Sequence, residues 1–203
     1  MSASVLDMSM SLDGFIAGPN ESLDNGLGDG GDRLHEWIFK GAGGPGDEGL
    51  EPFRDLGGVN GQVFDEVMST GAVVAGRGTF EPAGGWDGDH HDGVPIFIYS
   101  RREPGIDISG WPLVTYVDDV ATAVTRAKEG ADGKNVLVHG AAVAQLALAA
   151  GVLDELELHI IPVIFGQGRR LFEDLPAEQM ELERTRLLEG EDGVTHMHFR
   201  VRR

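Results

Sequence analysis

Hydrophobic positions along the chain follow two patterns, short apolar runs and helical spacings. Short runs predict buried strands, whereas apolar residues three or four positions apart predict amphipathic helices. Because strands and helices alternate, the pattern indicates an α/β domain with a largely parallel sheet. The predicted strands cover residues 5–10, 15–17, 72–75, 95–99, 113–117, 135–139 and 156–161. The predicted helices begin at Asp32, Asn60, Asp118 and Ala141, and they end near Gly41, Thr70, Gly130 and Ala150.

The C-terminal segment departs from this alternation. Residues 180–188 and 194–201 both alternate with period two, and the loop between them contains Asp192-Gly193, a hairpin turn signal. We therefore expect the parallel sheet to end in an antiparallel hairpin. No internal repeat or linker interrupts the pattern, which predicts one domain over residues 1–203.

Composition excludes several classes of function. The chain has 203 residues, 16 Lys and Arg against 34 Asp and Glu, a net charge of −18, and no cysteine. The missing cysteines exclude disulfides, thiolate zinc sites and a cysteine nucleophile, and the acidity disfavours nucleic acid as a partner. The first basic residue is Arg33, and the apolar stretches fall short of the roughly 20 residues that span a bilayer. We expect a cytoplasmic protein that does not bind membranes.

Glycine-rich segments offer two kinds of candidate phosphate site. Residues 26–31 and 41–46 match G-x-G-x-x-G, but neither follows a strand and opens a helix, so both are interpreted as loops. The required context occurs where predicted strands end, because open α/β sheets bind ligands at the carboxyl ends of their strands. These strand ends carry Gly76, Arg77, Gly78 and Thr79; Ser100, Arg101 and Arg102; and His139, Gly140, Ala141 and Ala142.

Two adjacent arginines stand out in so acidic a chain. Guanidinium groups pair with phosphate oxygens through two parallel hydrogen bonds, so Arg101 and Arg102 suit a phosphate. Together with the glycines at the other two strand ends, they predict a site for a dinucleotide that carries an extra 2′-phosphate. The alternative for each strand end alone is a tight turn or a solvated arginine.

Several motifs, in their order along the chain, resemble one family. They are SLDGFIAG at 11–18, GRGTF at 76–80, HGAAVAQ at 139–145, LDEL at 153–156 and IPVIFGQG at 161–168. They look like the dihydrofolate-reductase-like family, and more narrowly like relatives of the reductase domain of the bifunctional riboflavin-biosynthesis deaminase-reductase. The resemblance implies a three-layer α/β/α fold, NADPH as cofactor, a small heterocyclic substrate of the pterin or pyrimidine type, and a homodimer.

The resemblance also implies roles for residues. Gly76 to Thr79 would lie along the cofactor phosphates, Ser100 and Arg101 would meet the 2′-phosphate, and Gly140 to Val143 would receive the pyrophosphate. Asp13 and the loop of Phe165, Gly166 and Gly168 would border the nicotinamide, and Trp37 would wall the substrate pocket. Dihydrofolate reductase itself uses one acidic residue on its first helix, and here Asp13 and Glu36 are the candidates. His139-Gly140-Ala141 departs from relatives that have a second glycine.

Two other functions stay open from the sequence. One is a nucleotide-binding protein of this fold without turnover, and the other is a reductase that uses a flavin-type cofactor. The run from Asp87 to Asp92 contains His90 and His91, and we interpret it as a solvated acidic loop rather than a metal site. His159, His196 and His198 are interpreted as structural histidines, the last two on a polar, solvated strand face.

Overall fold

A computed structural model describes residues 2–39, 56–173, 175, 176 and 178–202. The predicted helix end at Gly41 and the glycine motif at 41–46 lie outside the described residues. The other glycine motif, at 26–31, forms a loop whose Leu27 carbonyl accepts from the Gly18 N–H at 2.8 Å. It packs against the chain after the second strand, in keeping with its interpretation as a loop.

An eight-stranded sheet forms the centre of the molecule, in the order β5-β4-β3-β6-β1-β7-β10-β9. The pairs among β5, β4, β3, β6, β1 and β7 are parallel, and β10 pairs antiparallel with both β7 and β9. This arrangement confirms the predicted mostly parallel sheet with a C-terminal antiparallel hairpin. The strands are β1 (Ser4–Ser11), β3 (Ala72–Gly76), β4 (Ile96–Tyr99), β5 (Val114–Val117), β6 (Val136–His139), β7 (Glu155–Ile161), β9 (Leu182–Glu189) and β10 (Thr195–Val201). A second small sheet pairs β2 (Phe15–Ala17) with β8 (Arg169–Arg170).

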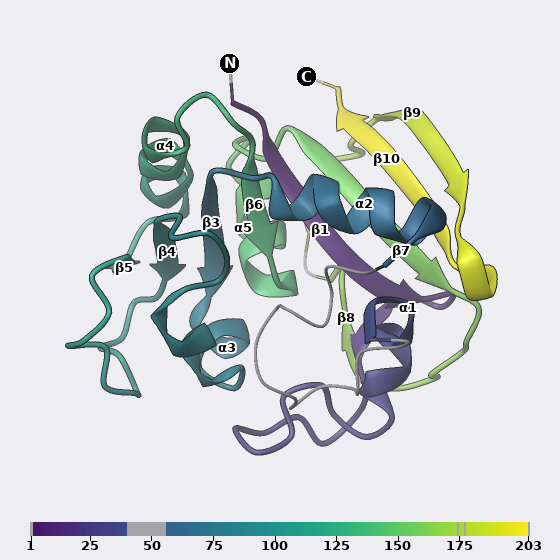
Figure 1. The fold of residues 1–203 in the computed structure, drawn as a ribbon, viewed down its shortest axis with the longest axis horizontal. Coiled ribbons are helices and arrows are strands. Elements are labelled where there is room, and N and C mark those ends of the chain that lie inside the picture. The colour runs from purple at the N-terminus through teal and green to yellow at the C-terminus, as the bar shows by residue number, and fades with distance from the viewer. Residues whose placement is uncertain (1, 40–55, 174, 177, 203) are drawn as a thin grey trace.

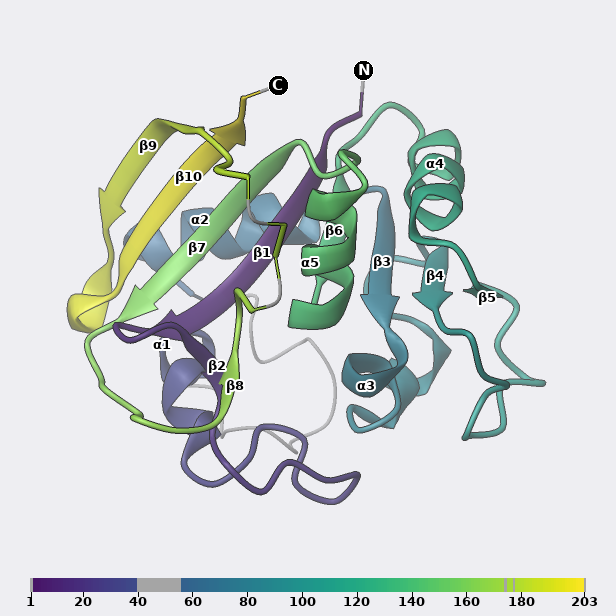
Figure 2. The same ribbon diagram turned by 180° about the vertical axis from the view of Figure 1, so that it is seen from behind.

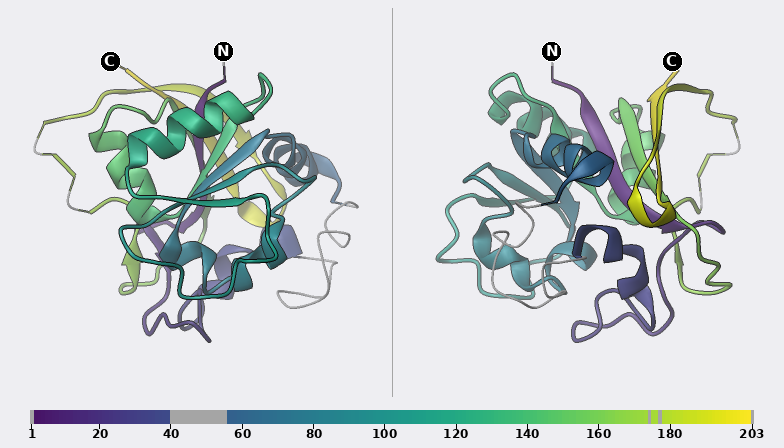
Figure 3. Two further views of the ribbon diagram at one scale, coloured as in Figure 1. Left: turned by 90° about the vertical axis from the view of Figure 1, so that its left-hand side faces the viewer. Right: turned by 45° about the vertical axis from the view of Figure 1, so that its right-hand side comes forward.

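Helices cover both faces of the sheet and so complete three layers. In Figure 1, α2 (Gly58–Met68) lies in front of the sheet, and Figure 2 shows α4 (Val120–Gly130) and α5 (Ala141–Ala149) on the opposite face. The left view in Figure 3, turned by 90°, separates these layers. The short helices α1 (Glu36–Phe39) and α3 (Arg77–Phe80) lie at the end of the sheet toward which the parallel strands run. Three 3₁₀ turns complete the described elements, at Gly31–Leu34, Gly84–Gly88 and Glu191–Gly193.

The two faces of β1 and β7 differ in polarity. Leu6, Met8, Leu156 and Leu158 are buried in the main core with residues of α4 and α5. On the α2 face, His159 and His196 are 1% and 0% exposed. The prediction that this histidine face is solvated is therefore wrong, because α1 and α2 cover it. The two histidines pair with polar groups instead, since His159 Nδ1 lies 2.8 Å from His196 Nδ1 and His196 Nε2 lies 3.0 Å from Asn60 Oδ1.

Two predicted helix starts need correction. The helix expected from Asp32 is divided into the turn Gly31–Leu34 and α1, with His35 between them. The N-cap of α4 is Asp119 rather than Asp118, since the Asp119 carboxylate accepts from the Thr122 N–H at 2.7 Å. An N-cap carboxylate that accepts from the third helical residue satisfies a backbone donor that the helix itself leaves unpaired.

β9 forms one edge of the large sheet and is mostly exposed. Leu182 and Leu187 on this strand are 40% and 44% exposed. These side chains are compatible with a contact to a second subunit, and the expected homodimer stays a prediction. Among the described helices, none is long and apolar enough to cross a membrane.

Candidate functional site

The carboxyl ends of β4, β3 and β6 bring the three predicted cofactor segments side by side. Register pairs Gly76 with Tyr99 and Ala75 with His139 on adjacent parallel strands. The segments 76–79, 100–102 and 139–143 therefore start at neighbouring points of one sheet edge. We refer to these three segments as the strand-end site.

Gly140 connects β6 to α5 in a conformation that suits glycine. Its φ is 100°, and an added Cβ would lie 2.2 Å from the Thr79 hydroxyl oxygen. Glycine thus allows the segment after β3 to approach the first turn of α5. Gly140 provides α5 with no side-chain cap, so the first-turn amides of Ala141, Ala142 and Val143 are available to an anion. This geometry fits a pyrophosphate group.

The arginines of the strand-end site differ in their partners. Arg101 and Arg102 are exposed, and the Arg102 N–H donates to the Ser100 hydroxyl at 3.0 Å, which shapes the turn after β4. Arg77 instead forms an ion pair at 3.6 Å with Glu81, whose side chain is 8% exposed. Arg77 is therefore engaged in α3, whereas the exposed guanidinium groups of Arg101 and Arg102 can meet a phosphate from solution.

Asp13 anchors the loop after β7 to the loop after β1. Its carboxylate accepts from the Phe165 N–H at 3.1 Å, from the Gly166 N–H at 2.7 Å and from the Ser11 hydroxyl at 2.7 Å. The Ser11 hydrogen bond is the main cause that lowers the pKa of Asp13 to about 2, so the carboxylate is ionised at neutral pH. The residues predicted to border the nicotinamide, Asp13, Phe165 and Gly166, are thus brought together, with the Asp13 carboxylate holding the two loop amides.

Gly168 holds the other end of the same loop. Its φ is 132°, and an added Cβ would lie 2.1 Å from the Ala17 carbonyl oxygen, so the loop passes close to β2. Since β1 lies next to β6 in the sheet, the loop is anchored after the strand that adjoins the strand-end site.

Trp37 and Glu36 lie at the carboxyl end of β7. Trp37 is 4% exposed, its indole N–H donates to the Ser9 hydroxyl at 2.8 Å, and its ring packs against His159 at 4.6 Å. Glu36 is exposed and pairs with Arg33 at 3.2 Å. Both line a hollow of about 150 Å³ that also touches Ile161 and Pro162. Glu36 is therefore an exposed, ion-paired side chain rather than a buried one.

A histidine cluster near the strand-end site was missed by the sequence reasoning. His90 packs against Trp86 at 4.6 Å and lies 6.4 Å from His139, measured between ring centroids. His91 is 2% exposed, so the interpretation of this run as a solvated loop is wrong for His91, whereas Asp87, Asp89 and Asp92 are exposed as expected. Within the described residues, no three His, Asp or Glu are arranged to hold a metal ion.

Hydrogen bonds hold this cluster in place. His91 Nε2 lies 3.1 Å from the Thr70 carbonyl oxygen, which can only accept, so Nε2 carries a proton. His91 Nδ1 lies 2.7 Å from His90 Nδ1, within hydrogen-bond distance. The adjacency of two histidines was the available sequence signal, but their burial depends on how the loop folds back onto Thr70.

The chain is similar to known proteins over most of its length. Residues 4–195 match the family model described as the RibD C-terminal domain. The uncharacterized protein YyaP of Bacillus subtilis strain 168 is 23% identical over 184 residues, which cover 84% of this chain and 80% of YyaP.

Solved structures confirm the predicted fold. A protein described as a riboflavin biosynthesis protein from Shewanella sp. PV-4 is 19% identical, with a TM-score of 0.67 over 99% of both chains. A pyrimidine reductase-like protein from Corynebacterium diphtheriae is 14% identical, with a TM-score of 0.59 over 100% of this chain and 92% of the other. A diaminohydroxyphosphoribosylaminopyrimidine deaminase/5-amino-6-(5-phosphoribosylamino)uracil reductase from Thermotoga maritima is 14% identical, with a TM-score of 0.60. The match covers 99% of this chain and 57% of the other.

Proposed function

Because this chain belongs to the RibD C-terminal domain family, we propose that it is an NADPH-dependent reductase of a small heterocyclic or carbonyl substrate. The observation that carries the proposal is the register of β4, β3 and β6, which aligns Gly76 with Tyr99 and Ala75 with His139. Three phosphate-compatible segments then share one sheet edge, at the position where open α/β sheets bind ligands.

Each segment has a separate part in holding the dinucleotide. The first-turn amides of α5, next to Gly140 and Thr79, would bind the pyrophosphate with the help of the helix dipole. Arg101 and Arg102 would pair with the 2′-phosphate, which distinguishes NADPH from NADH. NADPH, when bound, supplies the hydride. The residues of this chain would orient it, and Asp13, which holds the Phe165 and Gly166 backbone, would keep that loop beside it.

The substrate class rests on relatives and on the hollow at the carboxyl end of β7. Solved structures with this fold include a pyrimidine reductase-like protein and a deaminase/5-amino-6-(5-phosphoribosylamino)uracil reductase, of which this chain covers 57%. The hollow lined by Glu36 and Trp37 measures about 150 Å³ and would take part of a flat ring. We therefore propose a pterin, a pyrimidine or a related heterocycle as the substrate.

Titration with NADPH and NADH tests the cofactor. We expect NADPH to bind more tightly than NADH. Arg101→Ala should weaken NADPH binding by about tenfold or more, with little effect on NADH binding, because a charge-assisted contact with the 2′-phosphate is lost. Arg184→Ala is the matched control, since Arg184 is exposed on β9 at the far edge of the sheet. Cofactor fluorescence and thermal shift measure both affinities.

The same titration can contradict the proposal. If neither nucleotide binds, or if Arg184→Ala weakens NADPH as much as Arg101→Ala does, the strand-end site does not hold the cofactor. If NADPH binds but no heterocycle in a broad screen promotes its oxidation, the nucleotide-binding protein without turnover becomes the better interpretation. Flavin binding in place of NADPH would favour the flavin-type reductase.

A further inference from the structure

Three partly exposed aromatic side chains meet at the carboxyl end of β6. The ring of Trp86 lies 4.6 Å from that of His90 and 6.4 Å from that of His139, measured between centroids. Leu137 of β6 packs in the cluster that includes Val67 of α2. Because side chains alternate along a strand, His139 points to the same α2 face of the sheet. We call Trp86, His90 and His139 the Trp86 site.

The Trp86 site adjoins the proposed cofactor position. His139 is the last residue of β6, and the next residue, Gly140, precedes the first-turn amides of α5. β1, which leads into the Asp13 loop, lies between β6 and β7 in the sheet. The Trp86 site and the hollow of Glu36 and Trp37 therefore flank the carboxyl end of β1, where the proposed function puts the nicotinamide. A substrate beside the nicotinamide would come within reach of the Trp86 site.

A left-handed turn carries Trp86. Trp86 and Asp87 have φ of 50° and 49°, and positive φ continues through Gly85 and Gly88 on either side. Cβ atoms added to those two glycines would lie 2.4 and 2.3 Å from the Trp111 ring, so the turn is packed closely against it. Residues other than glycine adopt this conformation at a cost in free energy, and such strain is concentrated at functional sites. The packed turn fixes the indole of Trp86 at the edge of the site.

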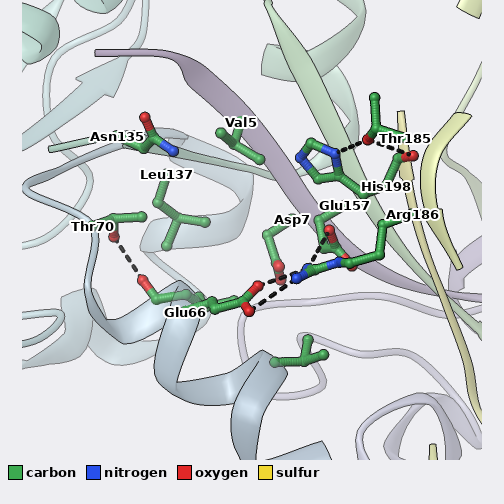
Figure 4. A pocket seen from close by; sticks show the side chains of 12 residues that line it. Val5, Asp7, Glu66, Thr70, Asn135, Leu137, Glu157, Thr185, Arg186 and His198 are labelled. Atoms are coloured by element: carbon green, nitrogen blue, oxygen red, sulfur yellow. Dashed lines mark hydrogen bonds and ion pairs between the residues drawn. The ribbon is translucent and has the colours of Figure 1, made fainter. Parts of the chain in front are cut away.

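His90 is anchored through His91 to the end of α2. The buried His91 donates from Nε2 to the Thr70 carbonyl oxygen at 3.1 Å, and its Nδ1 lies 2.7 Å from His90 Nδ1. Thr70 is itself fixed, since its hydroxyl donates to the Val67 carbonyl oxygen at 2.8 Å. Figure 4 shows the Thr70 side chain at the end of α2. The imidazole of His90 is therefore held in place by fixed backbone groups.

These hydrogen bonds leave His90 Nε2 as an acceptor. A second proton on His91 would put an uncompensated charge at a buried position, since its described hydrogen-bond partners, Thr70 and His90, are uncharged. His91 Nδ1 therefore accepts from His90 Nδ1. Burial lowers the pKa of His90 to about 3, so its ring is neutral at neutral pH and its one proton is on Nδ1. Its Nε2 has no hydrogen-bond partner among the described residues and is not one of the fully buried polar atoms that lack one.

We propose that the Trp86 site recognises the substrate ring through an N–H group, which donates to His90 Nε2 while Trp86 lies against the ring. The inference rests on the proposed function and narrows its substrate to a heterocycle with a free ring N–H, as in the lactam of a pyrimidinedione or a pterin. A ring with alkylated nitrogens offers no donor and leaves the acceptor unpaired. A site that is built to bind an N–H group discriminates strongly against an analogue that lacks it.

Calorimetric titration with lumazine and 1,3-dimethyllumazine, in the absence of nucleotide, tests the proposal. Lumazine is a flat bicyclic lactam with two ring N–H groups, and both are methylated in the second probe. We expect lumazine to bind at least about tenfold more tightly, because only lumazine can donate to His90 Nε2. His90→Phe keeps a ring but removes the acceptor, so it should abolish this preference. His90→Gln, whose side-chain oxygen can accept, should restore part of it.

Two further variants complete the test. His198→Phe is the matched control, since His198 lies on β10 toward the far edge of the sheet, and it should leave the preference for lumazine unchanged. Trp86→Leu should weaken both probes by a similar factor, because it removes the contact with the ring but keeps the acceptor.

Three results would overturn the proposal: no binding of lumazine, equal binding of the two probes, or an unchanged preference in His90→Phe. The first two are measured on the unaltered protein, so a folding defect in a variant does not affect them. Because no nucleotide is present, the outcome does not depend on whether the chain binds NADPH. A clear preference for lumazine in a chain that binds no NADPH would contradict the proposed cofactor and leave the ring recognition in place.

Discussion

At the scale of single residues, Asp13 shows how a sequence candidate acquires a defined role. The family motif predicts it beside the nicotinamide, and its carboxylate accepts from two backbone N–H groups of the loop after β7. Its lowered pKa, about 2, means that it keeps its charge at neutral pH and does not store a proton there. Its contribution to turnover is therefore expected to come from the position of the loop.

Asp13→Asn tests that role. The amide keeps one accepting oxygen but replaces the other with a donor, so either Phe165 or Gly166 loses its acceptor. We expect faster hydrogen exchange at these two amides, and a larger loss in kcat with any substrate found by screening than in NADPH affinity. Asp24→Asn, an exposed position of equal charge, is the control. Equal losses in kcat and affinity would refute the positioning role.

At the scale of elements, the junction of β6 and α5 is the most constrained part of the strand-end site. Gly140 has φ 100° and lies against Thr79, and α5 starts at the next residue. A side chain here would have to adopt an unfavourable backbone conformation and also displace Thr79. The approach of α3 to α5, and with it the opening of the phosphate position, depends on this glycine.

Gly140→Ala is expected to destabilise the protein by about 1 to 3 kcal/mol and to weaken NADPH binding. Gly133→Ala is the control, because Gly133 has φ 81° but an added Cβ there meets nothing within 4 Å. Chemical denaturation and cofactor titration separate the two effects. If both variants lost stability and NADPH affinity equally, the contact with Thr79 would have no functional importance.

At the scale of the whole molecule, buried histidines make stability depend on pH. Burial lowers the pKa of His35 and His196 to about 4 and that of His90 to about 3. In the unfolded chain these groups titrate near 6.5. As the pH falls below 6.5, the unfolded chain binds protons that the folded chain does not bind. The free energy of unfolding therefore decreases until the pH reaches the pKa values of the histidines in the folded state.

The expected loss is up to about 1.4 kcal/mol per pH unit for each such histidine. Protonation of carboxylates reduces the charge repulsion in a chain of net charge −18 and so raises the free energy of unfolding. Because ordinary carboxyl groups titrate near pH 4, this stabilisation is small above about pH 5. Urea unfolding between about pH 7.5 and pH 5 measures the balance. His90→Asn should reduce the decrease in the free energy of unfolding over this pH range. A stability that rises over this interval would show that the histidines do not dominate.

Local signals in the chain are sufficient to define most of the elements and the class of fold. Strand and helix periods, the turn at Asp192-Gly193 and the glycines after β3 and β6 are each carried by residues within a few positions of one another. For this reason the sequence alone predicts the strand-end segments, and the family motifs agree with them. Where local signals are ambiguous, as between Asp118 and Asp119, the predicted cap is displaced by one residue.

Which residues are buried together depends on contacts between distant segments. β1 lies between β6 and β7, which puts Asp7 opposite Glu157, and β10 pairs with β7, which puts His159 opposite His196. Nothing in the local pattern of these strands tells a solvated polar face from one that α1 and α2 cover. Burial and the pKa shifts that follow from it arise only when those segments assemble, and for that physical reason the Trp86 site and the paired histidines are properties of the tertiary structure.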